Sequence, residues 1–289
     1  RRSGAAAITG LLLMQRLLED GRMTPHYPAS AFYPRTPVID ALPRGPEPYR
    51  VAGTGSILVP NTSAHYGIED PRGFHGMVYK RLAATLPFWS RPIPVSHNEI
   101  TDLDSPFLDF LNVRYAIVKA DEEVPSSWPL RLVSGGAKLV ENPDALPRAF
   151  LPRAITGSDD LPRTGDFAAI ATVGPSIDGR SGAPDGTRPN GTGRVQPRRA
   201  GTGLTIDAVL ESDAWIVVSE TAWNGWRATI DGVRAPLHFA NHAFLAIRVP
   251  AGTHRIRLHY LPRSFISGAL ITLFAVAAMT AVSFRGKVR

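Results

Sequence analysis

The stretch WIVVSETAWNGWRATIDGVRAPLHFANHAFLAIRVPAGTHRIRLHY, which runs from Trp215 to Tyr260, decides the fold of this chain. Apolar and polar residues alternate in it, as in RIRLHY at 255–260, and a period of two is typical of strands with one buried face. Turn residues separate the alternating runs at Asn224-Gly225, Asp231-Gly232 and Pro250-Ala251-Gly252. Because an Asp-Gly pair between such runs is a strong hairpin signal, the sequence predicts consecutive antiparallel strands here.

The residues before this stretch extend the predicted sheet structure. LTIDAVL at 204–210 alternates in the same way, and with strands near 138–155 it predicts a two-layer β-sandwich over 141–262. The segment 174–203 interrupts the pattern, since it is rich in Gly, Pro and Arg and has almost no large apolar residue. Such a segment buries too little surface to offset its ordering entropy, so we expect a flexible loop there.

Residues 49–140 carry mixed signals that predict an α/β part. RVAGTGSILVP at 50–60 and VRYAIVKA at 113–120 are typical of short strands, while GMVYKRLAATLPFW at 76–89 and SPFLDFLNV at 105–113 show helical spacing of apolar residues. Asp104-Ser105-Pro106 predicts the start of the second helix. The fold class is therefore α+β, with a mixed α/β part, an antiparallel β-sandwich and a C-terminal helix.

The C-terminal helix is predicted to cross a membrane at 264–284. The run from Phe265 to Phe284 has no charged residue and matches the length of about 20 apolar residues that a bilayer span needs. Basic residues follow it at Arg285, Lys287 and Arg289. By the positive-inside rule, the tail 285–289 is expected in the cytoplasm and the bulk of the chain on the extracytoplasmic side.

The first 48 residues are predicted to connect the membrane to the folded part. The uncharged run 3–15 is shorter than the ~20 residues of a full span. We interpret residues 1–20 as the end of a truncated transmembrane helix, with a secretory signal or a soluble amphipathic helix as alternatives. Residues 21–48 are rich in proline and aromatic residues, which discourages helices and sheet centres and predicts an extended tether.

Composition excludes some classes of function. The chain of 289 residues has no cysteine, so it has neither disulfide bonds nor thiolate metal sites. Its net charge of +7 comes mostly from arginines that are dispersed along the sequence. Nucleic-acid binding needs a basic stripe with interleaved aromatic residues, so we expect no nucleic-acid partner.

Several motifs together resemble a known family. GWRATIDG, then ANHAFLAIRVPAGTHRIRLHYLP, then a membrane-length apolar segment resemble the carboxy-terminal end of YfhO-type bacterial membrane proteins, which are relatives of the GT-C lipid-linked-sugar glycosyltransferases. LVPNTSAHYGIEDPRGFHGMVYKRL, FLDFLNVRYAIV and LVENPDALPRAFLP precede them in the same order. The resemblance implies a polytopic protein of the bacterial inner membrane that transfers a sugar from a polyprenyl-phosphate carrier to a cell-envelope polymer.

The resemblance assigns no catalytic residue to this chain. In GT-C enzymes the catalytic carboxylate lies on an early outer loop between the first membrane helices, and this chain lacks those helices. It therefore implies a portion that positions the acceptor or glycan. Two alternatives are a membrane-anchored carbohydrate-binding module and a purely structural domain that braces the membrane helices.

Candidate binding residues cluster in the strand-rich stretch. Trp223 and Trp226, with Phe244 and Trp215, could form an aromatic surface on which sugar rings stack. Trp226 is in phase with core positions, whereas Trp223 beside a turn is the better candidate for an exposed ring. The proposed binding residues are Trp223, Asn224, Trp226, Asp231, Asn241 and His254.

Metal and cofactor sites are not indicated. His238 and His242 are four residues apart, but they lie in a strand-turn-strand context without a glutamate base, so HExxH chemistry is absent. The glycine-rich segment lacks the GKS or GKT of a phosphate-binding loop. We therefore expect no metal and no cofactor in this part of the protein.

Overall fold

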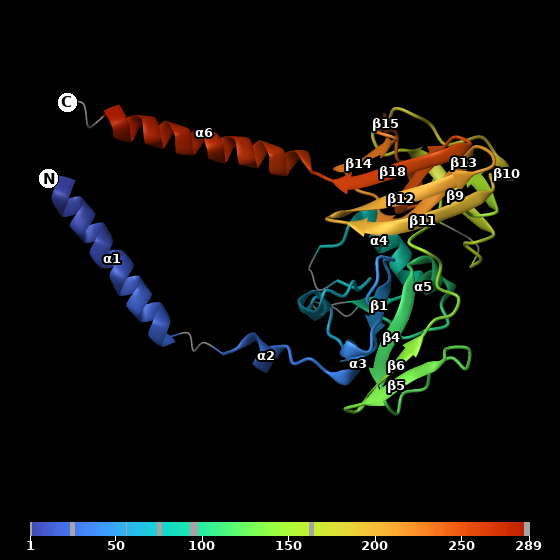
Figure 1. Cartoon of the computed structure of the whole chain (residues 1–289), viewed down its shortest axis with the longest axis horizontal. Coiled ribbons are helices and arrows are strands. Elements are labelled where there is room, and N and C mark those ends of the chain that lie inside the picture. Colours follow the sequence, from blue (N-terminus) through green and yellow to red (C-terminus); the bar gives the residue numbers. More distant parts are fainter. Residues whose placement is uncertain are drawn as a thin grey trace.

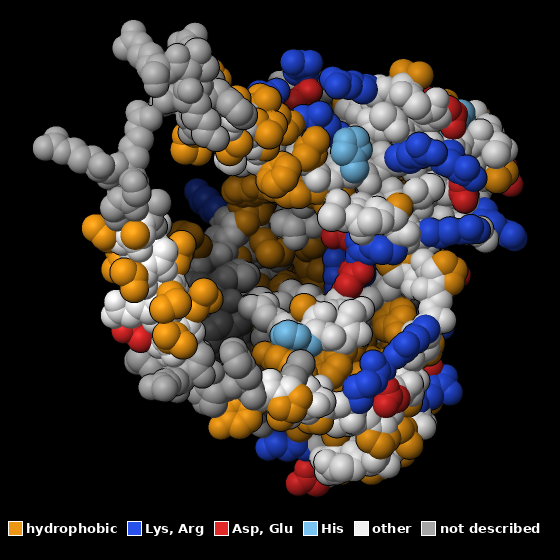
Figure 2. Space-filling view, turned by 60° about the vertical axis from the view of Figure 1, so that its left-hand side comes forward, with side chains coloured by type: hydrophobic (Ala, Val, Ile, Leu, Met, Phe, Trp, Pro, Cys, Tyr) orange, Lys and Arg blue, Asp and Glu red, His pale blue; other side chains and the backbone are white. Residues whose placement is uncertain are grey.

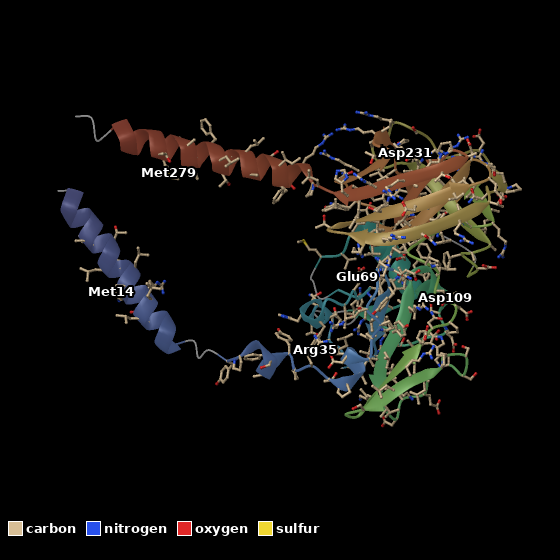
Figure 3. The ribbon with its side chains drawn as sticks, viewed as in Figure 1. Met14, Arg35, Glu69, Asp109, Asp231 and Met279 are labelled. Atoms are coloured by element: carbon tan, nitrogen blue, oxygen red, sulfur yellow. The ribbon has the colours of Figure 1, made fainter. Side chains whose placement is uncertain are left out.

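The computed structural model describes residues 2–23, 27–55, 57–73, 77–92, 98–161 and 165–285. Two long helices, α1 (Arg2–Met23) and α6 (Arg263–Arg285), extend from the same side of a β-rich body (Figure 1). Met14 on α1 and Met279 on α6 lie away from that body, whereas Glu69 and Asp109 lie within it (Figure 3). The predicted α+β class, with mostly antiparallel sheets and a C-terminal apolar helix, is confirmed.

The first part of the body is a four-stranded sheet with short helices on its faces. Its strand order is β1 (Arg50–Gly53), β4 (Val113–Lys119), β6 (Ala137–Glu141) and β5 (Leu130–Ser134), and only β1 and β4 are parallel. α3 (Pro37–Asp40) covers one face of the sheet, and α5 (Pro106–Phe110) packs on the other. The smaller elements are α2 (Ala29–Phe32), η1 (Thr62–Tyr66), α4 (Lys80–Thr85), η2 (Leu86–Phe88), β2 (Arg91–Pro92) and β3 (Asn98–Glu99).

Local sequence signals explain several of these elements. Ser105 caps α5 by accepting a hydrogen bond from the backbone N–H of Phe107 at 3.3 Å, and Pro106 occupies the first turn, where no N–H is needed. The YAIV run forms the buried centre of β4, as its continuous apolar character predicts. Val38 and Leu42 from the predicted tether are buried against the sheet, so part of that segment belongs to the core.

The second part is a sandwich of two larger sheets. The seven-stranded sheet has the order β10 (Thr187–Pro189), β8 (Ala154–Gly157), β9 (Ile170–Ser176), β16 (His238–Ala240), β17 (Phe244–Val249), β13 (Ala214–Thr221) and β7 (Ala149–Phe150). The five-stranded sheet has the order β11 (Gly193–Ala200), β12 (Gly203–Leu210), β18 (Gly252–Tyr260), β14 (Trp226–Ile230) and β15 (Val233–Ala235). The predicted strands of 215–260 are present, but the chain passes between the two sheets instead of forming one meander.

The central strands β13 and β17 of the seven-stranded sheet are buried on both faces. Ile216 and Val218 of β13 point toward the five-stranded sheet, while Trp215 and Val217 point toward α5 and the four-stranded sheet. A strand buried on both sides has a continuous apolar sequence instead of an alternating one, which explains the run WIVV. The described body therefore has one core inside the sandwich, a second between the sandwich and the α/β part, and a third, smaller one between the four-stranded sheet and α3.

The prediction of a flexible loop at 174–203 is corrected by the structure, because most of this segment is ordered. β11 pairs with β12 along its whole length, from Gly193 opposite Leu210 to Ala200 opposite Gly203. An edge strand obtains its ladder of hydrogen bonds from the backbone, so it needs few apolar side chains. Before β11, the Asn190 side chain donates to the carbonyl of Trp215 at 2.9 Å and accepts from its N–H at 2.8 Å. These contacts hold the segment against β13.

One strand expected in the sandwich belongs elsewhere. β6, near the start of the 138–155 region, pairs with β4 and β5 in the four-stranded sheet, whereas β7 and β8 join the seven-stranded sheet. The reason is the side-chain pattern of β6, which places Val140 in the core shared with α5 and Leu139 in the core under α3. β6 thus needs a sheet covered on both faces by the α/β part.

α6 is a candidate membrane span. Within the described residues it is the helix long and apolar enough to cross a bilayer, over Arg263–Thr280, and the body buries none of that window. α1 is also exposed along its described side chains, including Leu11, Leu17 and Leu18. Figure 2 shows apolar side chains in the recess on the side of the body from which the long helices extend.

Candidate functional site

A pocket of about 1050 Å³ lies where the sandwich meets α6. Its walls come from the β14–β15 hairpin, the residues after β9, and the link between β18 and α6. Arg263 and Ser264, the first residues of the candidate membrane span, line its edge. The pocket therefore opens at the level where α6 would enter a membrane.

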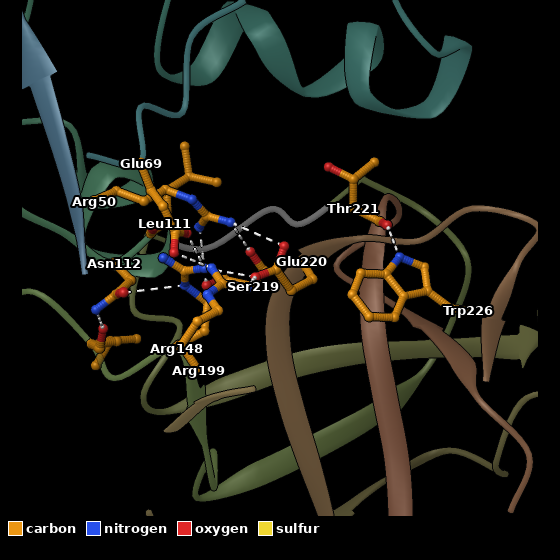
Figure 4. Close-up of polar contacts among 11 residues, drawn as sticks. Arg50, Glu69, Leu111, Asn112, Arg148, Arg199, Ser219, Glu220, Thr221 and Trp226 are labelled. Carbon is orange, nitrogen blue, oxygen red and sulfur yellow. Dashed lines mark hydrogen bonds and ion pairs between the residues drawn. The ribbon is translucent and has the colours of Figure 1, made fainter. Parts of the chain in front are cut away.

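Aromatic side chains form part of the pocket wall. Trp223 is 46% exposed, and its ring makes an edge contact with Tyr79 at a centroid distance of 4.3 Å. Trp226 is half-buried, because it packs on Tyr260 and its indole N–H donates to the carbonyl of Thr221 at 3.0 Å (Figure 4). A Cβ at Gly225 would lie 2.9 Å from the Tyr260 ring, so glycine permits this packing. Trp223 thus offers the more exposed ring, whereas the Trp226 ring is held by Tyr260 and Thr221.

Positive charge surrounds these rings. The lining includes four arginines and a single acidic residue, Asp178. Hydrogen bonds from Ser176 and from the backbone of Arg180 lower the pKa of the Asp178 carboxyl, so it is ionised at neutral pH. Arg180 lies 3.6 Å from Asp178, whereas the remaining three arginines make no ion pair with any residue that the structure describes. The four arginines are Arg180, Arg227, Arg234 and Arg263. The pocket is thus suited to an anion beside an apolar or sugar face.

The structure brings three of the six predicted binding residues together. Trp223, Asn224 and Trp226 all line this pocket. Asp231 and His254 meet each other elsewhere, with 2.7 Å between the Asp231 carboxylate and the His254 Nδ1. They line a separate shallow hollow of about 410 Å³ on the five-stranded sheet.

The Asp231–His254 pair stabilises the turn between β14 and β15. The Asp231 carboxylate accepts the backbone N–H of Arg255 at 2.8 Å, and this bond and His254 lower its pKa. The hydrogen bond to Asp231 raises the pKa of His254, whose Nε2 lies 3.3 Å from the carbonyl of Ala251. These contacts join the β14–β15 turn to the start of β18.

Asn241 was expected at the surface, and the structure corrects this. Its side chain is fully buried in a left-handed turn with φ of 43°, where its Oδ1 accepts the N–H of Thr172 at 3.0 Å. Trp215 and Phe244 are likewise buried in the core, so they contribute nothing to an aromatic binding surface. The predicted group of aromatic residues is instead completed by Tyr79 and Tyr260.

The two histidines four residues apart serve the fold. The Nδ1 atom of His238 lies 3.0 Å from the Gly174 carbonyl, and that of His242 lies 2.8 Å from the Asp159 carbonyl. In the described parts of the chain, no group of three or more His, Asp or Glu side chains could hold a metal ion. Arg81 completes the contacts near His242, because it pairs with Asp159 at 2.5 Å and lies 3.9 Å from the centre of the Phe239 ring.

A second group of arginines lies between the α/β part and the sandwich (Figure 4). The fully buried Arg148 donates to Glu69 at 2.8 Å, to Glu220 at 2.6 Å and to Asn112 at 3.2 Å. Arg50 on β1 donates to the carbonyls of Leu111 at 2.6 Å and Ser219 at 2.7 Å. We call Arg50, Arg148, Arg199, Glu69 and Glu220 the arginine junction.

Electrostatics in the arginine junction follow from burial and mutual proximity. Burial, followed by repulsion from Arg148, lowers the pKa of Arg50 to about 10, so it stays charged at neutral pH. Burial alone would raise the pKa of Glu69, but Arg148 and Arg199 together outweigh it and lower the pKa. Arg199 of β11 also contacts Glu69 directly and lies 3.5 Å from Glu220. The junction therefore joins the two parts of the body through paired charges.

Sequence reasoning missed the charged half of the pocket. Arg227 and Arg234 occupy outward positions of two paired strands, and such positions usually carry solvated charges. Arg180 and Arg263 are distant in the sequence, and only the fold brings them to the same hollow. Two positions in the sequence could have pointed to these arginines. Arg227 follows Trp226 close to a turn, and Arg263 follows Pro262 just before the long apolar run.

Comparison with known proteins gives one result that bears on this region. Residues 194–272 match the family model described as bacterial membrane protein YfhO. The YfhO resemblance is confirmed over these residues. The match spans β11 to β18 and the beginning of α6, and so includes most of the pocket wall. Together with α6, it supports a location in the membrane. No curated protein and no solved structure matches the chain.

Proposed function

We propose that the pocket beside α6 binds the phosphate and first sugar of a polyprenyl-phosphate sugar. In this proposal the described body is an extracytoplasmic, non-catalytic part of a bacterial inner-membrane protein related to lipid-linked-sugar glycosyltransferases. α6 crosses the membrane at 264–284, residues 285–289 lie in the cytoplasm, and residues 1–20 belong to another membrane helix. The body then positions the lipid-linked sugar or an envelope glycan during cell-envelope glycan synthesis.

The position and chemistry of the pocket carry this proposal. A lipid-linked sugar has three parts: an apolar chain in the membrane, a phosphate at its surface and a sugar above it. α6 enters the membrane at the pocket edge, Arg227 and Arg234 offer unpaired guanidinium groups, and Trp223 offers an exposed ring. Guanidinium groups bind phosphate through paired hydrogen bonds, and aromatic rings bind the apolar faces of ligands.

A positioning role fits the pocket better than a catalytic one. Proton transfer needs a group whose pKa lies near the working pH. Asp178, the acidic residue of the lining, has a lowered pKa and is exposed, so it is a poor proton donor. The lining instead supplies arginines and aromatic rings, which bind and orient.

The test measures binding to the full chain in lipid nanodiscs. The ligand is a short-chain polyprenyl-phosphate hexose, titrated against wild type and against the double variant Arg227→Ser/Arg234→Ser. Loss of two charge-assisted contacts predicts at least tenfold weaker binding, since a factor of ten corresponds to about 1.4 kcal/mol. The matched control is Arg44→Ser/Arg188→Ser, which removes the same charge from exposed positions outside the pocket. Equal binding by all three proteins would contradict the proposal.

Trp223 separates the remaining alternatives. Its exposed ring favours a binding site over a purely structural domain, so Trp223→Ala is expected to weaken binding several-fold, while the control Phe88→Ala at another exposed ring leaves binding unchanged. If a free neutral glycan binds as tightly as the lipid-linked sugar, the protein is a carbohydrate-binding module. If neither ligand binds, the body only braces the membrane helices.

A further inference from the structure

The outer face of the five-stranded sheet carries a row of arginines that are far apart in the sequence. Strand register places five residues on one line across the sheet: Arg198 of β11, Thr205 of β12, Arg257 of β18, Thr229 of β14 and Arg234 of β15. We call this line the arginine row. Their neighbours along each strand, such as Ile206 and Ile256, point into the sandwich core. The row therefore faces away from the core.

Regular sheet geometry fixes the spacing of the row. Arginines occupy the first, third and fifth strands, and threonines occupy the second and fourth. Because neighbouring strands lie about 4.8 Å apart, successive arginines are anchored about 10 Å from each other. A straight line of charges at this spacing differs from the irregular scatter of a solvated surface.

The arginines of the row are available to a ligand. Arg198, Arg234 and Arg257 are exposed, and none of their side chains makes a hydrogen bond or ion pair with a residue in the described ranges. Arg255, two residues before Arg257 on the same face of β18, differs from them, because its guanidinium group donates to the Asp207 carboxylate at 2.8 Å. Lys and Arg side chains also stand out over the sandwich in Figure 2.

We propose that the arginine row binds an extended anionic polysaccharide that carries one carboxylate on every second sugar. Each arginine would hold a carboxylate through two parallel hydrogen bonds, and each intervening threonine would reach the hydroxyl groups of the uncharged sugar. The alternation of Arg and Thr across the strands matches the alternation of charged and neutral sugars in such a polymer. Single-stranded nucleic acid fits less well, because base stacking needs aromatic rings and the row has none.

The row has a defined relation to α6. Arg257 lies six residues before Arg263 along β18 and the short link, so it is at most roughly 20 Å from the start of the candidate span. The row runs across the strands, and β18 leads directly into α6 (Figure 1). A polymer on the row would thus lie along the membrane surface, near the pocket. This inference rests on the proposed function and extends it: Arg198 and Arg257 hold the glycan, and Arg234, which also lines the pocket, lies where the glycan would meet the lipid-linked sugar.

The test uses hyaluronan oligosaccharides, in which every second sugar carries a carboxylate, and the full chain in nanodiscs. Arg198→Ser/Arg257→Ser is the test variant, because neither residue lines the pocket. We expect it to bind hyaluronan at least tenfold more weakly than wild type and to melt at the same temperature. Arg44→Ser/Arg188→Ser, with the same change of charge, is expected to bind as wild type does.

Three outcomes would overturn the inference: equal weakening in both double variants, equal binding of neutral dextran, or tighter binding of a single-stranded DNA of the same charge. Failure here is distinguishable from failure of the proposed function. The Arg198/Arg257 variant keeps the whole pocket lining, so its affinity for the polyprenyl-phosphate hexose is expected to remain that of wild type.

Discussion

Arg198 and Arg199 are neighbours on β11, yet they have opposite surroundings. Arg199 points inward, where it contacts Glu69 and lies 3.5 Å from Glu220 in the arginine junction. Arg198 points outward and makes no ion pair with a described residue. Because side chains alternate along a strand, one step in sequence moves an arginine from a structural contact to a free surface.

The same contrast separates the two arginine groups of the molecule. In the arginine junction, carboxylates and carbonyl groups accept hydrogen bonds from the guanidinium groups, and the charges join two parts of the body. In the arginine row and the pocket, several guanidinium groups lack such partners and face solvent. Pairing and burial, more than the number of arginines, therefore decide which of them can bind a ligand.

Arg148→Met is expected to have the largest effect on stability. Arg148 is fully buried, and its loss leaves Glu220 without its closest partner and Glu69 with Arg199 alone. Breaking a buried pair in this way typically costs about 3–5 kcal/mol. Urea unfolding of the full chain in detergent measures the change, with exposed Arg153→Met as the control. A loss below about 1 kcal/mol would remove the distinction between the two groups.

The adjacent pair on β11 gives a sharper comparison. Arg199→Ser is expected to lower the free energy of unfolding by about 1–2 kcal/mol, because its partners are half-buried, whereas Arg198→Ser is expected to change it by less than about 0.5 kcal/mol. Both variants remove the same side chain from the same strand. If both variants lose the same free energy of unfolding in the urea experiment, the ion pairs of Arg199 do not contribute to stability.

Acid should weaken the arginine junction through Glu69. Its pKa in the folded protein lies below the ordinary value of 4.5, so its contribution to stability is present above that pH and is lost as the pH falls through the folded pKa. Glu69→Gln lacks this contribution. The difference in melting temperature between wild type and Glu69→Gln is therefore expected to be largest at neutral pH and to shrink below about pH 4.5. A difference that is constant with pH would contradict the ionised pairing of Glu69.

Salt should affect the arginine junction and the arginine row differently. Of the changes considered, added salt is expected to alter stability least. At about 0.1 M salt the screening length is about 10 Å, and it acts mainly on exposed charges. Raising the salt to about 0.5 M is expected to change the melting temperature only slightly, because Arg50, Arg148 and Glu220 are shielded from solvent, while binding of hyaluronan to the arginine row weakens strongly. A large drop in melting temperature with unchanged binding of hyaluronan would contradict the distinction between a shielded arginine junction and an exposed arginine row.

Much of the fold was predictable because its signals are local. The alternation and turns of 215–260 predicted the strands, and Asp231 and Gly232 have the positive φ angles, 51° and 87°, that their hairpin turn requires. The sheet to which each strand belongs was not predictable, since it depends on contacts between distant segments. The ordering of 174–203 escaped prediction for the same reason, because Asn190 and the backbone partners on β12 supply it.

The candidate site was predictable in part. Trp223 and Asn224 stand beside a glycine turn, and this local context predicted their exposure. The pocket arginines come from four separate places in the chain, and only the fold assembles them. Asn241 shows the reverse error: a polar residue in a turn looks exposed in the sequence, but this turn is covered and its side chain hydrogen-bonds within the core.

Hydrogen exchange tests directly whether the pocket beside α6 binds a lipid-linked sugar phosphate. The full chain in nanodiscs would be compared with and without a polyprenyl-phosphate hexose, with exchange read by mass spectrometry. We expect slower exchange in the peptides that line the pocket, at 177–180, 223–237 and 260–264, and little change in the arginine junction. Unchanged exchange in those peptides at saturating ligand, or protection confined to other surfaces, would contradict it.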